Sequence, residues 1–161
     1  MNIIVKKYKN AELYIYGSGP LEGALRDYIN TNKLDRNVKI YGFIPNESLI
    51  KEIYYSDIIV LPSLYEAFSI AYLEAMACKK PLIVFDYQFS KELITDNETG
   101  ILVKQKSINQ LANKIIELIE NKSLRNKIGR NAYNYVLKKH SINNVAKEYV
   151  KVYRKLIWKN H

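Results

Sequence analysis

The stretch DIIVLPSLYEAFSIAYLEAMAC, residues 57–78, decides the fold of this 161-residue chain. Residues 57–61 are mostly β-branched and apolar, which predicts a buried parallel strand. Pro62 and Ser63 end that strand, and from about Ser69 apolar side chains recur at spacings of three and four, which predicts a helix. A strand that passes through a short loop into a helix is the repeating unit of α/β proteins.

Two carboxylates, Glu66 and Glu74, interrupt this otherwise apolar stretch. A buried carboxylate is unfavourable unless it is hydrogen-bonded. Hydroxyl groups of a bound sugar or ribose are suitable partners, so the pair is a candidate binding site. Solvated or salt-bridged structural acids are the more frequent explanation for any two glutamates in isolation, and both interpretations stay open on this pair alone.

The alternation of strand and helix extends on both sides of this stretch. Short β-rich runs predict strands at 12–16, 38–42, 57–61, 81–86 and 101–103, with segments between them that suit helices. This order predicts an α/β fold, a doubly wound Rossmann-like parallel sheet with helices on both faces. Ligands of such sheets bind beyond the carboxyl ends of the strands, which here carry the loops at 17–19, 42–44, 62–69 and 86–87.

Residues 107–161 change to helices alone. Ser107 with Gln110 is typical of a capping box, and Ser123 can cap the next helix. Apolar residues recur at helical spacing in three helices, which we interpret as core faces: Leu111, Ile115 and Leu118; Ile128, Ala132 and Val136; Val145, Tyr149, Val152 and Leu156. We therefore expect one domain over 1–161, with 107–161 as its C-terminal helices.

A glycine-containing turn follows the first predicted strand directly. Gly17 and Gly19 precede a predicted helix, an arrangement that lets the backbone approach a phosphate at a helix N-terminus. No third glycine follows at the dinucleotide-binding spacing. A tight structural turn and a ligand-binding loop therefore both remain possible interpretations.

The net charge of +9 is concentrated in the C-terminal part of the chain. Residues 1–103 carry 11 basic and 13 acidic side chains, whereas 104–161 carry 14 basic and 3 acidic ones. Such basicity suits nucleic acid or an anionic membrane surface, but lysines that only solvate helix faces explain it better. The single cysteine, Cys78, suits a reducing compartment, so we expect a cytoplasmic protein, with peripheral contact to the inner face of the membrane as an option.

Several motifs occur together in a fixed order: YGSGP at 16–20, YGFIP at 41–45, SDIIVLPS at 56–63, the Glu66 and Glu74 pair running into EAMAC, and ETGILV at 98–103. With these motifs the chain closely resembles, from about residue 3 to 158, the C-terminal nucleotide-sugar-binding domain of family 4 glycosyltransferases. That family has the two-domain GT-B fold. The glutamate spacing alone is only moderately specific, and the ordered set of motifs makes the match strong.

The resemblance implies roles for individual residues. Glu66 matches the catalytic-site glutamate that contacts the transferred sugar, and Glu74 matches the glutamate that binds the ribose hydroxyls. Backbone amides at Phe68, Ser69 and Ile70 match the groups that hold the diphosphate, and the main chain of Ile44 matches a contact to the base. The resemblance also implies retention at the anomeric carbon, a nucleotide-diphosphate sugar as donor, and neither a bound metal nor another cofactor.

This sequence departs from the family pattern at several positions. The family often has glycine where Ala67 and Ser69 stand, and a glycine is frequent at Lys79. The first two replacements are small, so the phosphate-binding loop is still expected. His140 and His161 match no catalytic position, and we expect His140 on the surface.

Two parts of the family's structure have no counterpart in these residues. One is the N-terminal acceptor-binding domain, and the other is the first strand of the C-terminal domain, because residues 1–10 resemble the end of the helix that follows it. In the doubly wound order the first strand lies centrally, so the strands at 12–17 and 57–61 would each expose an open edge. Three arrangements are then possible. The two strands could pair directly, residues 1–5 could fill the space between them, or a partner chain or a second copy could supply a strand. We favour the last of these.

These features support three hypotheses on function. The first is the donor-binding half of a retaining glycosyltransferase, which uses a UDP- or GDP-type donor for a glycan, lipid or small acceptor and is inactive alone. The second is a non-catalytic nucleotide-sugar-binding or assembly module, and a GT-B-type sugar-nucleotide epimerase is a related enzymatic alternative. The third, less favoured, is a nucleic-acid or membrane-surface binder that uses the basic helices.

Overall fold

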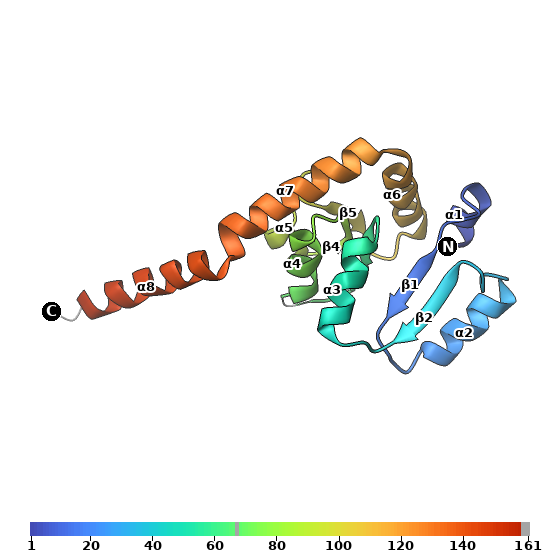
Figure 1. Cartoon of the computed structure of the whole chain (residues 1–161), viewed down its shortest axis with the longest axis horizontal. Helices are drawn as coiled ribbons and strands as arrows, with labels where there is room; N and C mark the ends of the chain where they lie inside the picture. Colours follow the sequence, from blue (N-terminus) through green and yellow to red (C-terminus); the bar gives the residue numbers. More distant parts are fainter. Residues whose placement is uncertain (67, 159–161) are drawn as a thin grey trace.

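The computed structural model describes residues 1–66 and 68–158, with helices packed around short parallel strands and one helix projecting from the body (Figure 1). The expectations for Ala67 and His161 fall outside the described residues. The strands are β1 (Leu13–Tyr16), β2 (Val38–Gly42), β3 (Ile59–Leu61), β4 (Leu82–Asp86) and β5 (Ile101–Lys104). The helices are α1 (Asn2–Lys7), α2 (Glu22–Thr31), α3 (Asn46–Tyr55), α4 (Ile70–Ala77), α5 (Ser90–Leu93), α6 (Ile108–Glu120), α7 (Lys122–His140) and α8 (Ile142–Trp158).

The five strands form two parallel sheets. β1 pairs with β2, and β3, β4 and β5 pair in that order. The α/β fold with parallel strands and helices on both sides is thus confirmed, but the expectation of one sheet is corrected to two. Direct pairing of β1 with β3 does not occur, and residues 2–7 form α1 and not a strand, so two of the three foreseen outcomes are wrong.

Three apolar clusters hold the elements together. The largest lies between α3, α4, α7 and one face of β3 and β4, with Tyr72, Met76 and Ala132 fully buried. A second lies on the other face of β4 and β5, where Leu118 of α6 and Ile128 of α7 cover the sheet. The third joins α1 and α2 to one face of β1 and β2. The core faces predicted for α6 and α7 are therefore confirmed.

The predicted helix caps differ from those in the structure. α6 begins after Ser107 as expected, but the Ser107 side chain makes no capping bond, and Gln110 Oε1 accepts a hydrogen bond from Lys104 N at 2.7 Å. α7 is capped by Asn121, whose Oδ1 accepts from Leu124 N at 2.9 Å, and not by Ser123. Asn121 also ends α6, so one residue closes one helix and opens the next.

Lys79 lies two residues after the end of α4, in a left-handed conformation with φ +60°. Its N–H donates to Met76 O at 3.0 Å, and Lys80 N donates to Ala75 O at 3.1 Å. This pair of bonds is the Schellman motif, whose left-handed residue is most often glycine. The left-handed backbone conformation required here therefore explains why glycine is frequent at this position in the family.

Replacing Lys79 with glycine is expected to stabilise the fold by about 0.5 kcal/mol. Glycine removes a left-handed penalty of about 1 kcal/mol, which is partly offset by loss of the cation–π contact with Tyr133. In that contact the Lys79 Nζ lies 4.5 Å from the ring centroid. Urea denaturation measures the difference, with Lys80→Gly as a control that is expected to destabilise. A Lys79→Gly protein less stable than the wild type would contradict the assignment.

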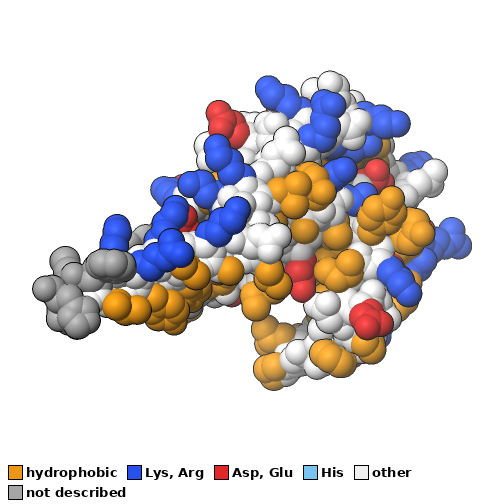
Figure 2. Space-filling view, turned by 60° about the vertical axis from the view of Figure 1, so that its left-hand side comes forward, with side chains coloured by type: hydrophobic (Ala, Val, Ile, Leu, Met, Phe, Trp, Pro, Cys, Tyr) orange, Lys and Arg blue, Asp and Glu red, His pale blue; other side chains and the backbone are white. Residues whose placement is uncertain are grey.

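α8 projects from the body and leaves its apolar face uncovered. Val145, Tyr149, Val152 and Leu156, expected in the core, are between 37% and 60% exposed. Figure 2 shows hydrophobic side chains along one side of the projecting helix and Lys and Arg side chains along another. Helical spacing thus predicts the face correctly, but its predicted burial is wrong, since α8 packs mainly against α7. Among the described helices, none combines the length and apolar character needed to cross a membrane.

Candidate functional site

The loops after β1 and β2 are joined by their glycines. Gly17 has φ +118° and Gly42 has φ +69°, left-handed conformations that favour glycine. Gly17 N donates to Gly42 O at 2.7 Å, which ties the two loops together. A Cβ at Gly17 or Gly19 would meet no atom within 4 Å, so the space beside this loop is open. The predicted ligand loop is therefore well formed, although no described contact assigns it a ligand.

Glu74 lies in the second turn of α4 and is half-buried. Its Oε1 accepts a hydrogen bond from Asn46 Nδ2 at 2.8 Å. Asn46 is the first residue of α3 and follows Ile44 by two positions, so this bond brings the carboxylate to the loop after β2. A carboxylate has about four acceptor sites, which leaves room for hydroxyl donors besides Asn46. Asn46 suits a helix cap by sequence, and its contact with Glu74 depends on tertiary packing.

Glu66 lies in the loop after β3 and is also half-buried. Its Oε1 accepts a hydrogen bond from Ser63 Oγ at 3.2 Å, across three residues of the same loop. Near it, burial, the hydrogen bond to Tyr87 and the charge on Glu66 raise the pKa of the Tyr72 phenol. Tyr72 is therefore neutral at physiological pH and can act only as a neutral hydrogen-bonding group.

Tyr72 also connects α4 to the loop after β4. The hydroxyl groups of Tyr72 and Tyr87 lie 3.1 Å apart, and Tyr87 is held by Ser90, whose Oγ accepts from Tyr87 N at 3.0 Å. The contact from Gly17 to Gly42 links the loops after β1 and β2, and the contacts from Asn46 to Glu74 and from Tyr72 to Tyr87 connect α3 and the loop after β4 to α4, the helix that follows the loop after β3. This is the convergence that a doubly wound sheet predicts for a ligand site.

The start of α4 offers main-chain donors beside these loops. Ser69 is buried and extended, and it precedes the helix without a side-chain capping bond. Phe68 and Ile70 on either side are 56% and 65% exposed. The first N–H groups of a helix lack acceptors within it and carry its positive dipole end, so they attract anions.

His140, expected on the surface, is half-buried at the end of α7. Its ring centroid lies 5.5 Å from that of Tyr135 and 6.4 Å from that of Phe68. Its Nε2 is buried and has no hydrogen-bond partner among the described residues. Nothing local in the sequence signals this position, because the contact joins the end of α7 to Phe68, two residues before α4.

A family profile described as "Glycosyl transferases group 1" matches residues 1–135. The chain belongs to this family. Among curated relatives, it is 28% identical over 152 residues to a poly(ribitol-phosphate) alpha-N-acetylglucosaminyltransferase of Staphylococcus aureus, covering 94% of this chain and 30% of that protein. It is 34% identical over 145 residues to an uncharacterized glycosyltransferase of Methanocaldococcus jannaschii, covering 90% and 37%. The chain thus spans about a third of the length of these relatives.

Solved glycosyltransferase structures share the fold. A crystal structure of a Staphylococcus aureus TarM variant with fondaparinux, alpha-GlcNAc-glycerol and UDP superposes with a TM-score of 0.84 at 28% identity, covering 93% of this chain and 30% of that one. The C-terminal domain of a group 1 glycosyl transferase from Francisella tularensis superposes with a TM-score of 0.78 at 33% identity, covering 88% and 75%. These matches confirm a C-terminal-type domain of a GT-B glycosyltransferase.

Proposed function

We propose that this chain is the donor-binding domain of a retaining glycosyltransferase of family 4 type. It binds a nucleotide-diphosphate sugar of the UDP or GDP type in the loops at the carboxyl ends of β1 to β4. The observation that carries the proposal is the hydrogen bond between Asn46 and Glu74, which brings a half-buried carboxylate to the loop after β2. In this assignment Glu74 accepts hydrogen bonds from the ribose, and the main chain of Ile44 contacts the base.

The other proposed contacts to the donor come from residues in or next to the same loops. Glu66 contacts the transferred sugar, and main-chain amides at Phe68, Ser69 and Ile70 hold the diphosphate. Charge that develops on the leaving diphosphate is stabilised by these oriented dipoles, as in other sites where an anion forms. Gly17 and Gly19 leave space for the diphosphate near the start of α2. Neither a metal nor another cofactor is assigned to the site.

The relatives support this class of donor. The solved TarM complex contains UDP, and the curated relatives include a GDP-mannose-dependent mannosyltransferase of Corynebacterium glutamicum. Both donor bases therefore occur in proteins similar to this chain. Their acceptors differ, and the acceptor here is assigned only as a glycan, a lipid or a small molecule. Since the chain covers about a third of such enzymes, we propose that it binds donor but transfers no sugar by itself.

A non-catalytic module that binds nucleotide sugars for a partner is the second candidate function, and it would use the same donor loops. A cytoplasmic location and contact with the inner membrane face stay predictions. The exposed apolar face and basic residues of α8 are the feature that favours such contact. Nucleic acid remains the less favoured partner.

Thermal shift with a panel of nucleotides tests donor binding. UDP or GDP is expected to raise the melting temperature by about 5 °C or more at concentrations near 100 times the dissociation constant, because a ligand that binds only the folded state stabilises it. ADP and inorganic diphosphate serve as controls for base selectivity and for plain anion binding. A melting temperature that no nucleoside diphosphate changes would contradict the proposal. Salt-sensitive RNA binding that survives Glu74→Ala would favour the third hypothesis.

A further inference from the structure

Two aromatic rings meet beside Glu66, between the loops after β3 and β4. Tyr65 precedes Glu66 in the first loop, and Phe89 lies in the second loop, directly before α5. Their ring centroids are 6.4 Å apart, and the two rings are nearly perpendicular, at 88°. Edge-to-face contacts of this kind are favourable, so these two residues, which we call the aromatic pair, join the two loops.

Hydrogen bonds to the main chain hold both loops that carry the aromatic pair. Gln105, which follows β5, donates from Nε2 to Leu64 O at 2.9 Å. In the loop after β4, Ser90 Oγ donates to Tyr87 O at 2.7 Å, and Tyr87 N donates to the same Oγ at 3.0 Å. The aromatic pair is therefore presented by ordered loops, which lowers the entropy cost of binding a ligand there.

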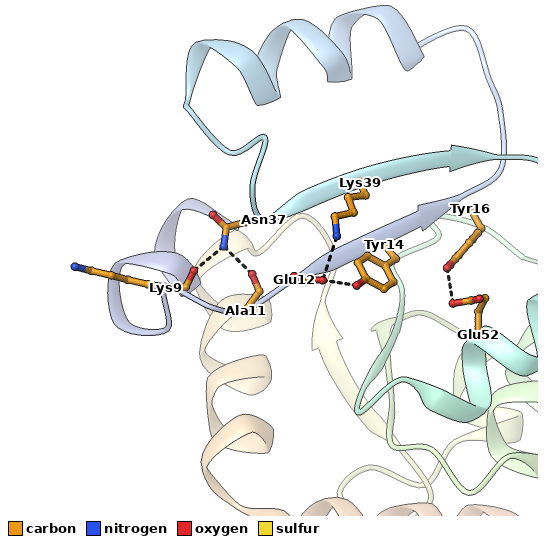
Figure 3. A network of polar contacts seen from close by, with 8 residues as sticks. All are labelled: Lys9, Ala11, Glu12, Tyr14, Tyr16, Asn37, Lys39 and Glu52. Carbon is orange, nitrogen blue, oxygen red and sulfur yellow. Dashed lines mark hydrogen bonds and ion pairs between the residues drawn. The ribbon is translucent and has the colours of Figure 1, made fainter.

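Tyr65 keeps most of its ring surface free, since the residue is 76% exposed. The tyrosines of β1 provide a contrast, because their polar tips are occupied within the chain. Tyr14 donates to Glu12, and Tyr16 donates to Glu52 at 2.8 Å (Figure 3). An exposed tyrosine is common by itself, and it is the position beside the candidate site that gives Tyr65 a candidate role.

Polar groups complete a ring of contacts around Glu66. Burial, the hydrogen bond to Tyr87 and the charge of Glu66 together raise the pKa of the Tyr72 phenol, so Glu66 lies near Tyr72. The hydroxyl groups of Tyr72 and Tyr87 are 3.1 Å apart, and Tyr87 is two residues before Phe89, whose ring contacts Tyr65. Two phenols carry two hydroxyl protons, and the bond between them uses one, so the other is left to donate to a ligand.

A neutral pyranose matches this combination of groups. Such a sugar presents C–H groups on one face and hydroxyl groups around its rim, so it needs an apolar surface and hydrogen-bonding partners together. The aromatic pair offers the surface, and the carboxylate of Glu66 and the hydroxyls of Tyr72 and Tyr87 offer the partners. A sugar that carries a carboxylate matches poorly, because its charge would lie near Glu66 and beside apolar rings.

We propose that the aromatic pair of Tyr65 and Phe89 determines specificity for the transferred sugar, by selecting a neutral pyranose whose C–H face packs on Tyr65. This inference rests on the proposed function, because it assigns the sugar end of the same donor. Glu74, which contacts Asn46 beside the loop after β2, is assigned to the ribose. The aromatic pair lies on the loops after β3 and β4, so the ribose and the sugar are assigned to different loops of the site.

Ligands with and without the sugar test this assignment. Calorimetry measures the affinity of the wild type for UDP, for GDP and for UDP-glucose, UDP-N-acetylglucosamine and GDP-mannose. Tyr65→Ala is then compared with the wild type on the donor that binds most tightly and on the nucleoside diphosphate of that donor. The variant is expected to bind the donor about fivefold more weakly and the nucleoside diphosphate within about twofold of the wild type, because only the donor carries the sugar.

Three further variants separate the contact with the sugar from effects on the fold. Tyr65→Phe keeps the ring and is expected to bind the donor within about twofold of the wild type. Phe89→Leu removes the ring contact but stays apolar, and it is expected to weaken donor binding in the same selective way as Tyr65→Ala. Tyr55→Ala is the matched control, because Tyr55 is 80% exposed and also meets a neighbouring ring edge-on, that of Tyr54 at 5.3 Å. It lies at the end of α3 and is expected to leave both affinities unchanged.

The outcomes distinguish this inference from the proposed function. A wild type that binds no nucleoside diphosphate overturns both. A wild type that binds UDP or GDP but none of the three donors overturns the inference alone, as does a Tyr65→Ala protein that binds the donor unchanged or loses donor and nucleoside diphosphate equally. If the tightest donor contains UDP, UDP-glucuronic acid is expected to bind about tenfold more weakly than that donor, and equal affinity overturns the selection of a neutral sugar.

Discussion

Replacing Gly129 with alanine is expected to destabilise the fold by about 2 kcal/mol. Gly129 lies in α7, where the helix crosses the turn after α4, and a Cβ there would lie 2.0 Å from Lys79 O and 2.7 Å from Lys79 C. Both atoms are backbone atoms, so the helix or the turn must move. Overpacking of this kind costs about 3 kcal/mol, and the better helix propensity of alanine returns about 1 kcal/mol.

Gly23→Ala provides the matched control for this experiment. Gly23 is also helical, in α2, but a Cβ there would meet no atom within 4 Å. The control is therefore expected to gain up to about 1 kcal/mol from helix propensity alone. Urea denaturation of both variants measures the difference of about 3 kcal/mol. Equal changes in the two proteins would show that α7 does not approach the turn as closely as described.

The alternation of strands and helices could be predicted because short local sequence patterns specify it. β-branched runs such as 57–61 and the helical spacing after Ser69 specify element type within a few residues, and every predicted strand has a counterpart in the structure. The residue that caps α7 could not be predicted in this way, since Asn121 and Ser123 are equally suitable side chains two positions apart. The structure decides for Asn121, which also closes α6.

Contacts between distant elements could not be predicted in the same way. The bond from Asn46 to Glu74 and the packing of His140 near Phe68 join different elements, and no local pattern specifies them. In α8, the spacing of apolar residues predicts an apolar face on the helix, but it does not predict which element, if any, covers that face. The doubly wound order predicts a central strand between β1 and β3, but the sequence left open whether these two strands would pair directly. The structure shows that they do not.

Loss of the Glu74 carboxylate is expected to weaken nucleotide binding about 10- to 150-fold, corresponding to about 1.5–3 kcal/mol for hydrogen bonds to a charged group. The carboxylate is half-buried, and one of its oxygens is held by Asn46, so it is already oriented before a nucleotide binds. Calorimetry of UDP, or of the nucleotide that gives the largest thermal shift, measures the affinity of Glu74→Ala. Glu47→Ala, an exposed carboxylate in the first turn of α3, is the control and is expected to bind like the wild type.

A nucleotide without ribose hydroxyls separates the assigned role from a general loss of charge. If Glu74 accepts hydrogen bonds from the 2′ and 3′ hydroxyls, the wild type and Glu74→Ala are expected to bind the 2′,3′-dideoxy nucleotide with nearly equal affinity. The double cycle of protein variant and nucleotide then yields a coupling free energy close to the full loss seen with the ribonucleotide. A coupling near zero, with Glu74→Ala weakening both nucleotides alike, would mean that the carboxylate acts through the shape of the loop after β2 and not on the ribose.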